Sequence, residues 1–218
     1  MSLSFVIPIY NNYSLLHQLL WDIFKNCTRP NEILLIDDYS DERELQRGVE
    51  WWIGTDMLPI EYIKKEKNDG FLLTSNYGLK KAKSDTVSLV STDVRIHKDL
   101  VAWTKERSLD NAVLGGRIID WDSGWNTFNK VTYPYVEGWL LTTSKVAWEK
   151  LGYFDEQFAP SDMEDVDFST KAQKVNMLLE PYPDKYVSHL GAASIGYTAE
   201  RELITQRNKK LFEAKWAK

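Results

Sequence analysis

The amino-terminal part of the chain alternates short apolar runs with longer segments of helical periodicity. Residues 3–9 form an uncharged run rich in β-branched side chains, which predicts a strand buried on both faces. After it, apolar residues recur at helical spacing from Leu15 to Cys27, until Pro30 stops the pattern. The same order of strand and helix then repeats along residues 32–90. This alternation predicts βαβ units, and therefore an α/β fold with a mostly parallel central sheet flanked by helices.

The predicted elements of this part follow one another at even spacing. Strands are expected at residues 3–9, 32–36, 60–64 and 86–90, and helices at about 13–27, 41–52 and 71–83. The second half is less regular, with strands expected at 113–119 and 186–189 and helices at 144–151, from about Glu164, and at 198–218. Because no linker, repeat or low-complexity segment interrupts the chain, we expect one domain over residues 1–218.

Polar residues follow the four predicted strands of the amino-terminal part. In a parallel sheet built from right-handed crossovers, the carboxyl ends of the strands lie on one side, and ligands bind there. The residues at these ends are Tyr10-Asn11, Asp37-Asp38, Asn68-Asp69-Gly70 and Ser91-Thr92-Asp93. A dinucleotide-binding Rossmann enzyme would carry glycines after its first strand, whereas this chain carries Pro8 to Asn12 there. The pattern therefore predicts a ligand site of another kind, rich in acids.

Overall charge and cysteine content narrow the classes of function. The formal net charge is −5 and the pI is about 5.3, so we expect no nucleic-acid partner, because such binding needs a basic surface. An acidic protein that binds a phosphate needs local help from backbone N–H groups or a metal ion. Cys27 is the single cysteine and excludes an intramolecular disulfide, and neither a signal peptide nor a transmembrane segment is evident. These features predict a cytoplasmic protein.

Five motifs, in the same order along the chain, resemble those of the family 2 glycosyltransferases with the GT-A fold. They are residues 4–11 (SFVIPIYN), 35–40 (LIDDYS), 68–71 (NDGF), 76–79 (NYGL), and 152–156 (GYFDE) together with 164–167 (EDVD). The resemblance implies a single Rossmann-like GT-A domain that transfers a sugar with inversion from a nucleoside-diphosphate donor to an acceptor hydroxyl. It also implies a donor half of about residues 1–95, an acceptor half of about 96–198 and a carboxyl-terminal helix at 199–218.

The resemblance places the nucleotide at the ends of the first strands. It implies that Asp38, the second acid of its pair, accepts a hydrogen bond from the nucleobase, and that Pro8 and Tyr10 line the same pocket. A carboxylate at a strand end can accept from a base N–H, and an aromatic ring can cover the base. The further nucleotide-binding residues that it implies are Asn68, Asn76, Thr92 and Asp93. The alternative is an acidic pair that only caps the following helix.

Ser91-Thr92-Asp93 stands where the family carries Asp-x-Asp, whose last acid binds a divalent cation. Asp93 keeps that acid, but Ser91 replaces the first one. The resemblance implies that His189 is a second metal ligand and that the ion, Mn²⁺ or Mg²⁺, bridges the two phosphates of the donor. The alternative is that Asp93 is an acid in a turn and His189 is structural.

Glu164-Asp165 lies at the predicted start of a helix. Glycosyl transfer needs a general base for the acceptor hydroxyl, and the resemblance implies Asp165 in that role with Glu164 as its helper. The alternative is a pair of first-turn acids that stabilise the helix dipole. Aromatic residues between Trp121 and Trp139 border the acceptor by the same resemblance, and Gly138 and Trp139 are expected to contact it.

The predicted partners are a UDP-, dTDP- or GDP-sugar donor and a saccharide or glycoconjugate acceptor. The rival hypothesis is a non-catalytic nucleotide-sugar or carbohydrate binding module, which the loss of the acid at Ser91 motivates. A glycosidase is less well supported, because Asp38 and Asp93 would then have no role, and a nucleotidyltransferase would need a glycine-rich phosphate loop. Residues 209–216 mix basic and aromatic side chains, which fits peripheral contact with an anionic membrane or, preferably, a packed terminal helix.

Overall fold

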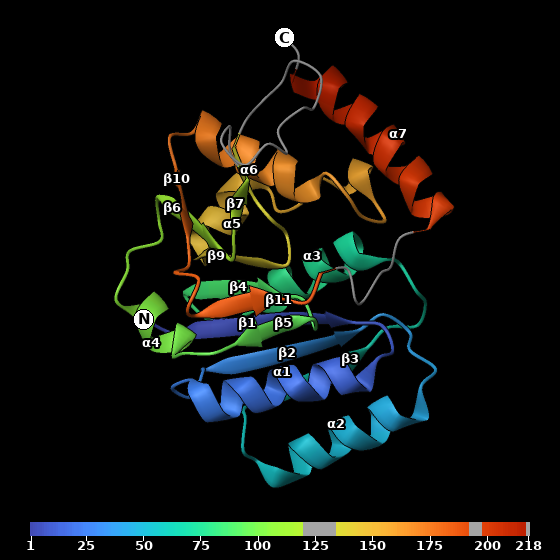
Figure 1. The fold of residues 1–218 in the computed structure, drawn as a ribbon, viewed down its shortest axis with the longest axis vertical. Coiled ribbons are helices and arrows are strands. Elements are labelled where there is room, and N and C mark those ends of the chain that lie inside the picture. The colour runs from blue at the N-terminus through green and yellow to red at the C-terminus, as the bar shows by residue number, and fades with distance from the viewer. Residues whose placement is uncertain (120–133, 192–197, 217–218) are drawn as a thin grey trace.

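A seven-stranded sheet forms the centre of the protein (Figure 1). The structure is a computed structural model and describes residues 1–119, 134–191 and 198–216. In their order across the sheet, the strands are β10 (Leu178–Pro181), β6 (Ala112–Gly115), β9 (Leu140–Ser144), β4 (Thr86–Val90), β1 (Leu3–Ile9), β2 (Glu32–Asp37) and β3 (Ile60–Lys64).

Most neighbouring strands of this sheet run parallel. The exception is β9, which pairs antiparallel with both β4 and β6. In the parallel part, Ile7 of β1 lies opposite Leu35 of β2, and Phe5 lies opposite Ser88 of β4. The predicted α/β class with a mostly parallel sheet is therefore confirmed.

The remaining elements surround this sheet. The helices are α1 (Tyr13–Asn26), α2 (Arg43–Thr55), α3 (Phe71–Lys81), α4 (Leu100–Lys105), α5 (Lys145–Leu151), α6 (Glu164–Lys174), α7 (Ala199–Trp216) and a short 3₁₀ helix (Glu156–Phe158). Two antiparallel pairs complete the described structure: β5 (Val94–Ile96) with β11 (Val187–His189), and β7 (Ile118–Ile119) with β8 (Tyr135–Val136).

Helices cover both faces of the sheet. This explains why the interior positions of the central strands β1 and β2 carry no charged residue. Along β1, Phe5 and Ile7 pack with α1 and α2, whereas Val6 packs on the opposite face with α3. Figure 1 shows α1 and α2 on one side of the sheet and α5 and α6 on the other. Alternate residues of one strand thus enter two different cores, as expected for a strand buried on both faces.

The strand predicted at residues 113–119 is wrong as a single element. The structure divides it into β6 and β7, which pair with different partners. The division falls at Gly116, where an added Cβ would lie 1.6 Å from the ring of Trp139. The chain turns out of the sheet where the indole needs that space.

The carboxyl-terminal helix α7 packs against the side of the molecule that carries α6 (Figure 1). Phe212 is buried, and Lys215 forms ion pairs with Asp155 and Asp167. These contacts fit the packed-helix alternative for residues 209–216. Among the described residues, no helix combines the length and the apolar character that a bilayer crossing requires.

Candidate functional site

A cavity of about 900 Å³ opens where the carboxyl ends of β1, β2 and β4 meet the start of α6. Residues from the amino-terminal part of the chain, from residues 117–191 and from α7 all line it. The predicted site residues among them are Pro8, Tyr10, Asp38, Asn68, Thr92, Asp93, Gly138, Trp139, Glu164, Asp165 and His189. One cavity therefore brings together residues that the sequence spreads over most of the chain.

Asn76 is the predicted nucleotide-binding residue that the structure places elsewhere. It is 2% exposed on α3 and does not line the cavity. Its amide donates to the carbonyl of Phe154 at 2.9 Å and accepts from the N–H of the same residue at 3.0 Å. The oxygen and the NH₂ group of this amide both bond to the backbone of the same residue. Asn76 therefore ties α3 to the segment before the 3₁₀ helix instead of binding a ligand.

The two acids at the end of β2 have different surroundings: the first has a structural role, and the second faces the cavity. Asp37 is fully buried, accepts the N–H of Ser40 at 2.7 Å and is hydrogen-bonded by the Tyr62 hydroxyl. Asp38 lines the cavity, and its carboxylate accepts the backbone N–H groups of Asp69 at 2.9 Å and Gly70 at 2.8 Å. The same carboxylate therefore shapes the loop that leads into α3.

Gly70 is required at the point where this loop meets the turn before α6. Its φ of 84° lies in the left-handed region. An added Cβ would lie 2.5 Å from Cβ of Pro160, so no other residue fits without displacing the turn. The loop that leads into α3 and the turn before α6 are in direct contact here.

Asp93 and His189 lie next to each other, at the side of the cavity where the small β5–β11 sheet lies. Nε2 of His189 is 3.2 Å from Oδ1 of Asp93, and the imidazole stacks on the Trp139 indole with ring centroids 4.8 Å apart and planes 9° apart. The indole N–H donates to Glu137 at 2.9 Å. Thus the two predicted metal ligands are adjacent, and the stacked indole orients the imidazole.

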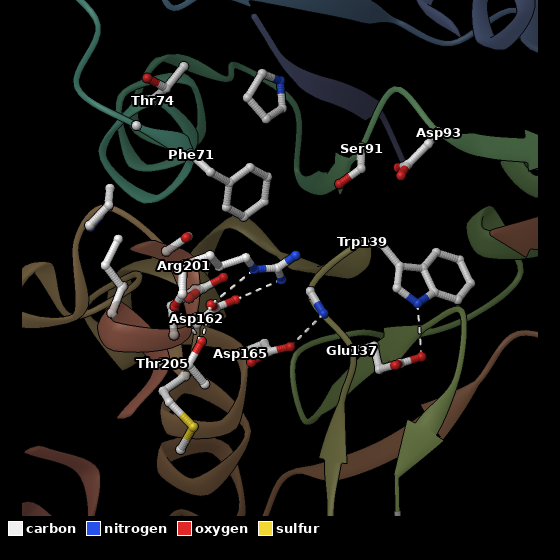
Figure 2. A pocket seen from close by; sticks show the side chains of 18 of the residues that line it. Phe71, Thr74, Ser91, Asp93, Glu137, Trp139, Asp162, Asp165, Arg201 and Thr205 are labelled. Carbon is white, nitrogen blue, oxygen red and sulfur yellow. Dashed lines mark hydrogen bonds and ion pairs between the residues drawn. The ribbon is translucent and has the colours of Figure 1, made fainter. Parts of the chain in front are cut away.

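No group of three or more His, Cys, Asp or Glu side chains gathers as a metal site in the described part of the chain. Asp93 and His189 form a pair, and the hydroxyl-bearing Ser91 lines the cavity beside them (Figure 2). Two protein ligands are sufficient to hold a metal ion only if substrate oxygens and water supply the other ligands, as is common for Mg²⁺ in phosphate sites.

Glu164 and Asp165 begin α6 and line the same cavity. Asp165 accepts the N–H of Gly138 at 2.8 Å and of Val166 at 2.8 Å. Burial raises the pKa of Asp165 to about 6, although these two N–H groups favour the ionised form. Burial and the neighbouring Asp165 raise the pKa of Glu164 well above the usual carboxyl range.

Comparison with known proteins identifies the family. Residues 4–161 match the family described as Glycosyl transferase family 2. The chain belongs to this family. The match ends just before α6, so that Glu164, Asp165 and His189 lie beyond it.

Two curated relatives of this family 2 chain are glycosyltransferases by description. The Bacillus subtilis (strain 168) protein "Uncharacterized glycosyltransferase YwdF" is 31% identical over 93 residues, which cover 43% of this chain and 33% of that protein. The human polypeptide N-acetylgalactosaminyltransferase 12 is 21% identical over 244 residues, covering 92% of this chain and 41% of the human one. The chain therefore spans about a third to two fifths of the length of these relatives.

Several solved structures share the fold. GalNAc-T7 with UDP, GalNAc and Mn²⁺ has a TM-score of 0.67 at 18% identity, over 86% of this chain and 43% of that chain. Staphylococcus aureus TarS 1–349 with UDP-GlcNAc has 0.67 at 21%, over 97% and 66%. The mannosyltransferase PcManGT from Pyrobaculum calidifontis, with GDP-Man and Mn²⁺, has 0.66 at 15%, over 95% and 60%. These similarities confirm the GT-A-like fold of the family 2 chain.

The structure adds charged residues that sequence reasoning missed. Arg201 of α7 binds Asp162 through both carboxylate oxygens, at 2.9 and 3.2 Å, and Thr205 donates to the same side chain at 2.6 Å. Arg117 binds Glu137 in the same two-point manner, at 2.6 and 2.7 Å. Figure 2 shows Asp165 between these two groups. No sequence motif marks them, because each pair joins residues from separate elements.

Three of the aromatic residues expected near the acceptor, Trp121, Trp125 and Tyr133, lie outside the described residues. Tyr135 and Trp139 are described and line the cavity. Of the aromatic residues expected near the acceptor, the two that are described therefore lie on β8 and just before β9.

Proposed function

We propose that this protein is an inverting glycosyltransferase that moves a sugar from a nucleoside-diphosphate donor to an acceptor hydroxyl. The observation that carries the proposal is that Asp38, Asp93 and Asp165 line one cavity. A nucleobase acceptor, a phosphate-side acid and a buried general base are the three functions that such a reaction needs. Membership of glycosyl transferase family 2 supports the same conclusion.

Asp165 is the general base of the proposed reaction. A pKa of about 6 leaves it mainly ionised near neutral pH but still able to hold a proton. Two backbone N–H groups fix its carboxylate at the edge of the cavity. As the acceptor oxygen attacks the anomeric carbon, the acceptor proton passes to Asp165 and the bond to the diphosphate breaks. The displacement is direct, so that the sugar is inverted.

Glu164 acts beside this base as a hydrogen-bonding group. Burial and the neighbouring Asp165 raise the pKa of its carboxyl, which favours the protonated form that can donate a hydrogen bond. Oε2 of Glu164 is buried and has no hydrogen-bond partner among the described residues. We therefore assign Glu164 to orienting the acceptor next to Asp165.

Asp93 and His189 would hold a divalent ion, Mn²⁺ or Mg²⁺. Their carboxylate oxygen and imidazole nitrogen are suitable ligands, and the two atoms already lie 3.2 Å apart. When bound, such an ion supplies a Lewis acid for the departing diphosphate. Two of the structures with the same fold contain Mn²⁺ by their descriptions.

The proposed donor is a UDP-, dTDP- or GDP-sugar, and the proposed acceptor is a saccharide or glycoconjugate. Pro8, Tyr10 and Asp38 bound the nucleotide end of the cavity, and Gly138 and Trp139 bound the acceptor end next to Asp165. Similar structures contain UDP-GlcNAc or GDP-Man. The division into a donor half of about residues 1–95 and an acceptor half of about 96–198 is part of this proposal.

Asp165→Asn tests the proposal. We expect nucleoside-diphosphate release from a panel of UDP-, dTDP- and GDP-sugars to fall at least about a hundredfold, while nucleotide affinity stays within about threefold. Asp110→Asn is a matched control, because Asp110 is exposed and lies away from the cavity. Turnover that survives in Asp165→Asn would refute the assignment of the base.

A non-catalytic binding module is the second candidate, and Ser91 favours it by leaving a metal pair without a third acid. The same donor panel separates the two candidates. If the unmodified protein binds nucleotide but releases none from any donor, with a range of saccharide acceptors present, the binding module is correct.

A further inference from the structure

We propose that Trp139, held in place by Glu137, is a positioning residue that fixes the imidazole of His189 for a divalent ion. The inference rests on the proposed function, in which Asp93 and His189 hold that ion, and deepens it. It explains how these two ligands can serve although Ser91 supplies no carboxylate.

The two ligand atoms already have the spacing that a shared ion requires. Nε2 of His189 lies 3.2 Å from Oδ1 of Asp93. Two neighbouring ligands of an octahedral Mg²⁺ ion, each at about 2.1 Å and at right angles to each other, lie about 3.0 Å apart. An ion can therefore enter with little movement of either side chain, provided that the imidazole stays where it is.

The backbone of this region does not fix the imidazole by itself. His189 pairs with Val94 across the β5–β11 sheet, and the N–H of Leu190 donates to the carbonyl of Asp93 at 3.0 Å. These bonds hold the main chains of both ligands together. The His189 side chain is 23% exposed, and its ring can still turn about the side-chain bonds. A contact to the ring itself is needed to hold it.

The indole of Trp139 provides this contact. The two ring centroids are 4.8 Å apart and the ring planes differ by 9°, so that one face of the imidazole is covered. A turn of the imidazole out of this plane would drive it into the indole. Groups that orient a metal-binding histidine contribute strongly to metal affinity even though they do not touch the metal.

The indole is itself held by several contacts. Its N–H donates to Glu137 at 2.9 Å (Figure 2), and Arg117 holds that carboxylate through two bonds of 2.6 and 2.7 Å. The carbonyl of Trp139 accepts the N–H of Ser91 at 2.9 Å. Gly116 leaves room for the ring, since an added Cβ would lie 1.6 Å from it. The position of the imidazole thus depends on a side chain whose own position is fixed.

The same short segment also reaches the proposed base. The N–H of Gly138, between Glu137 and Trp139, donates to Asp165 at 2.8 Å. A substitution that loosened the whole segment would therefore disturb Asp165 as well as His189. The experiments must separate a specific effect on the metal from a general loosening.

Titration with Mn²⁺ alone, followed by the NMR line widths of the imidazole protons, measures the effect on the metal. The chain has three histidines, so His189 can be distinguished from His17 and His97. In the wild type, the signals of His189 should broaden at a lower Mn²⁺ concentration than those of His17 on α1. Trp139→Leu should raise the concentration that His189 requires about tenfold, and Trp139→Phe, which keeps a flat ring, should stay within about threefold of the wild type.

The outcomes distinguish the inference from the proposed function. An equal Mn²⁺ requirement in the wild type and Trp139→Leu, or an equal loss in Trp139→Leu and Trp139→Phe, overturns the inference and leaves the metal pair intact. If Mn²⁺ does not broaden His189 selectively in the wild type, the metal pair and the inference both fail.

Isothermal titration with UDP, dTDP and GDP, with and without Mn²⁺, detects a general loosening. Trp139→Leu should keep the metal-free dissociation constants within about twofold, but should reduce the increase in affinity caused by Mn²⁺ at least about fivefold. Trp51→Leu is the matched control, because Trp51 is 47% exposed on α2 and does not line the cavity. An equal loss in Trp139→Leu with and without Mn²⁺ overturns the inference.

Glu137→Ala is an independent variant that retains both rings, and it tests the inference even if Trp139→Leu does not fold. The indole loses its acceptor, so the Mn²⁺ concentration that broadens His189 should rise about threefold. Glu149→Ala, at an exposed glutamate of α5, is the control and should behave as the wild type. An unchanged Mn²⁺ requirement in Glu137→Ala refutes the role of Glu137.

Discussion

Glu164 and Asp165 are neighbours in the chain, but their carboxyl groups accept different numbers of hydrogen bonds. Asp165 accepts from two backbone N–H groups, whereas Oε2 of Glu164 has no partner among the described residues. Burial raises the pKa of both groups, but the two N–H groups limit that of Asp165 to about 6. Of the two carboxyl groups, Asp165 is therefore the one whose ionised form the backbone stabilises.

The pKa of Asp165 predicts an acid limb in the pH dependence of transfer. A general base works only when it is ionised, and the pKa of this carboxyl is raised to about 6. The rate should therefore rise with pH through about 6 and level off above it, as measured by kcat/KM from about pH 5 to about pH 8. In Glu164→Gln the limb should stay in place, because the pKa of Asp165 is raised mainly by burial. A limb near about pH 4, the range of an ordinary carboxyl, would contradict the assignment.

Site residues could be predicted from sequence where they follow a recognisable strand or belong to a motif. Asp38 and Asp93 follow buried strands, and Asp165 belongs to the acidic motif at the start of α6. Asn76 belongs to a motif too, but its amide is used on Phe154, which only the packing of α3 reveals. Arg201 has no motif, because its role depends on where α7 packs.

At the scale of elements, α7 holds the turn that precedes α6. Asn208 is fully buried, and the two hydrogens of its NH₂ group are shared among the carbonyls of Phe158 at 2.7 Å, Ser161 at 2.8 Å and Asp162 at 2.8 Å. In this turn Asp162 and Met163 adopt φ values of 70° and 78°, which residues other than glycine rarely adopt. The helix thus stabilises a strained turn that sets the direction of α6.

Asn208→Ala should lower the free energy of unfolding by about 2–3 kcal/mol, because it removes the two N–H donors that these three carbonyls share. It should also lower kcat more than it weakens nucleotide binding, since α6 carries the proposed base Asp165, whereas the residues proposed to bind the nucleotide lie at the ends of β1 and β2. Urea unfolding and titration with nucleotide measure the two effects. Asn111→Ala, at an exposed asparagine, should change stability by less than about 0.5 kcal/mol. Wild-type stability in Asn208→Ala would refute the role of this amide.

The longer strands of the amino-terminal part were predictable, and most of the short strands were not; the three-residue β11, within the strand predicted at 186–189, is an exception. β1 and β2 are buried on both faces, so their composition alone distinguishes them from helices. β7 and β8 have two residues each, which is too short for any periodicity. β9 was missed because its sequence, LLTTS, is followed directly by α5. No turn residues separate the strand from the helix.

At the scale of the whole molecule, one sheet joins the two parts of the site. β9 comes from the second half of the chain, yet it pairs with β4 of the first half on one side and with β6 on the other. The described residues of both halves should therefore unfold together. In urea, far-ultraviolet circular dichroism and tryptophan fluorescence should give one coincident transition. Two separated midpoints would show that the halves are independent units.

The position of β9 also affects how the protein is made. β4 is completed at Val90, but the strand that covers its free edge ends only at Ser144. During synthesis, a buried, uncharged strand therefore has an open edge while the intervening residues emerge from the ribosome. Fragments that end between these two points should associate with one another through this edge, and chaperone binding to the nascent chain should be strongest over the same interval.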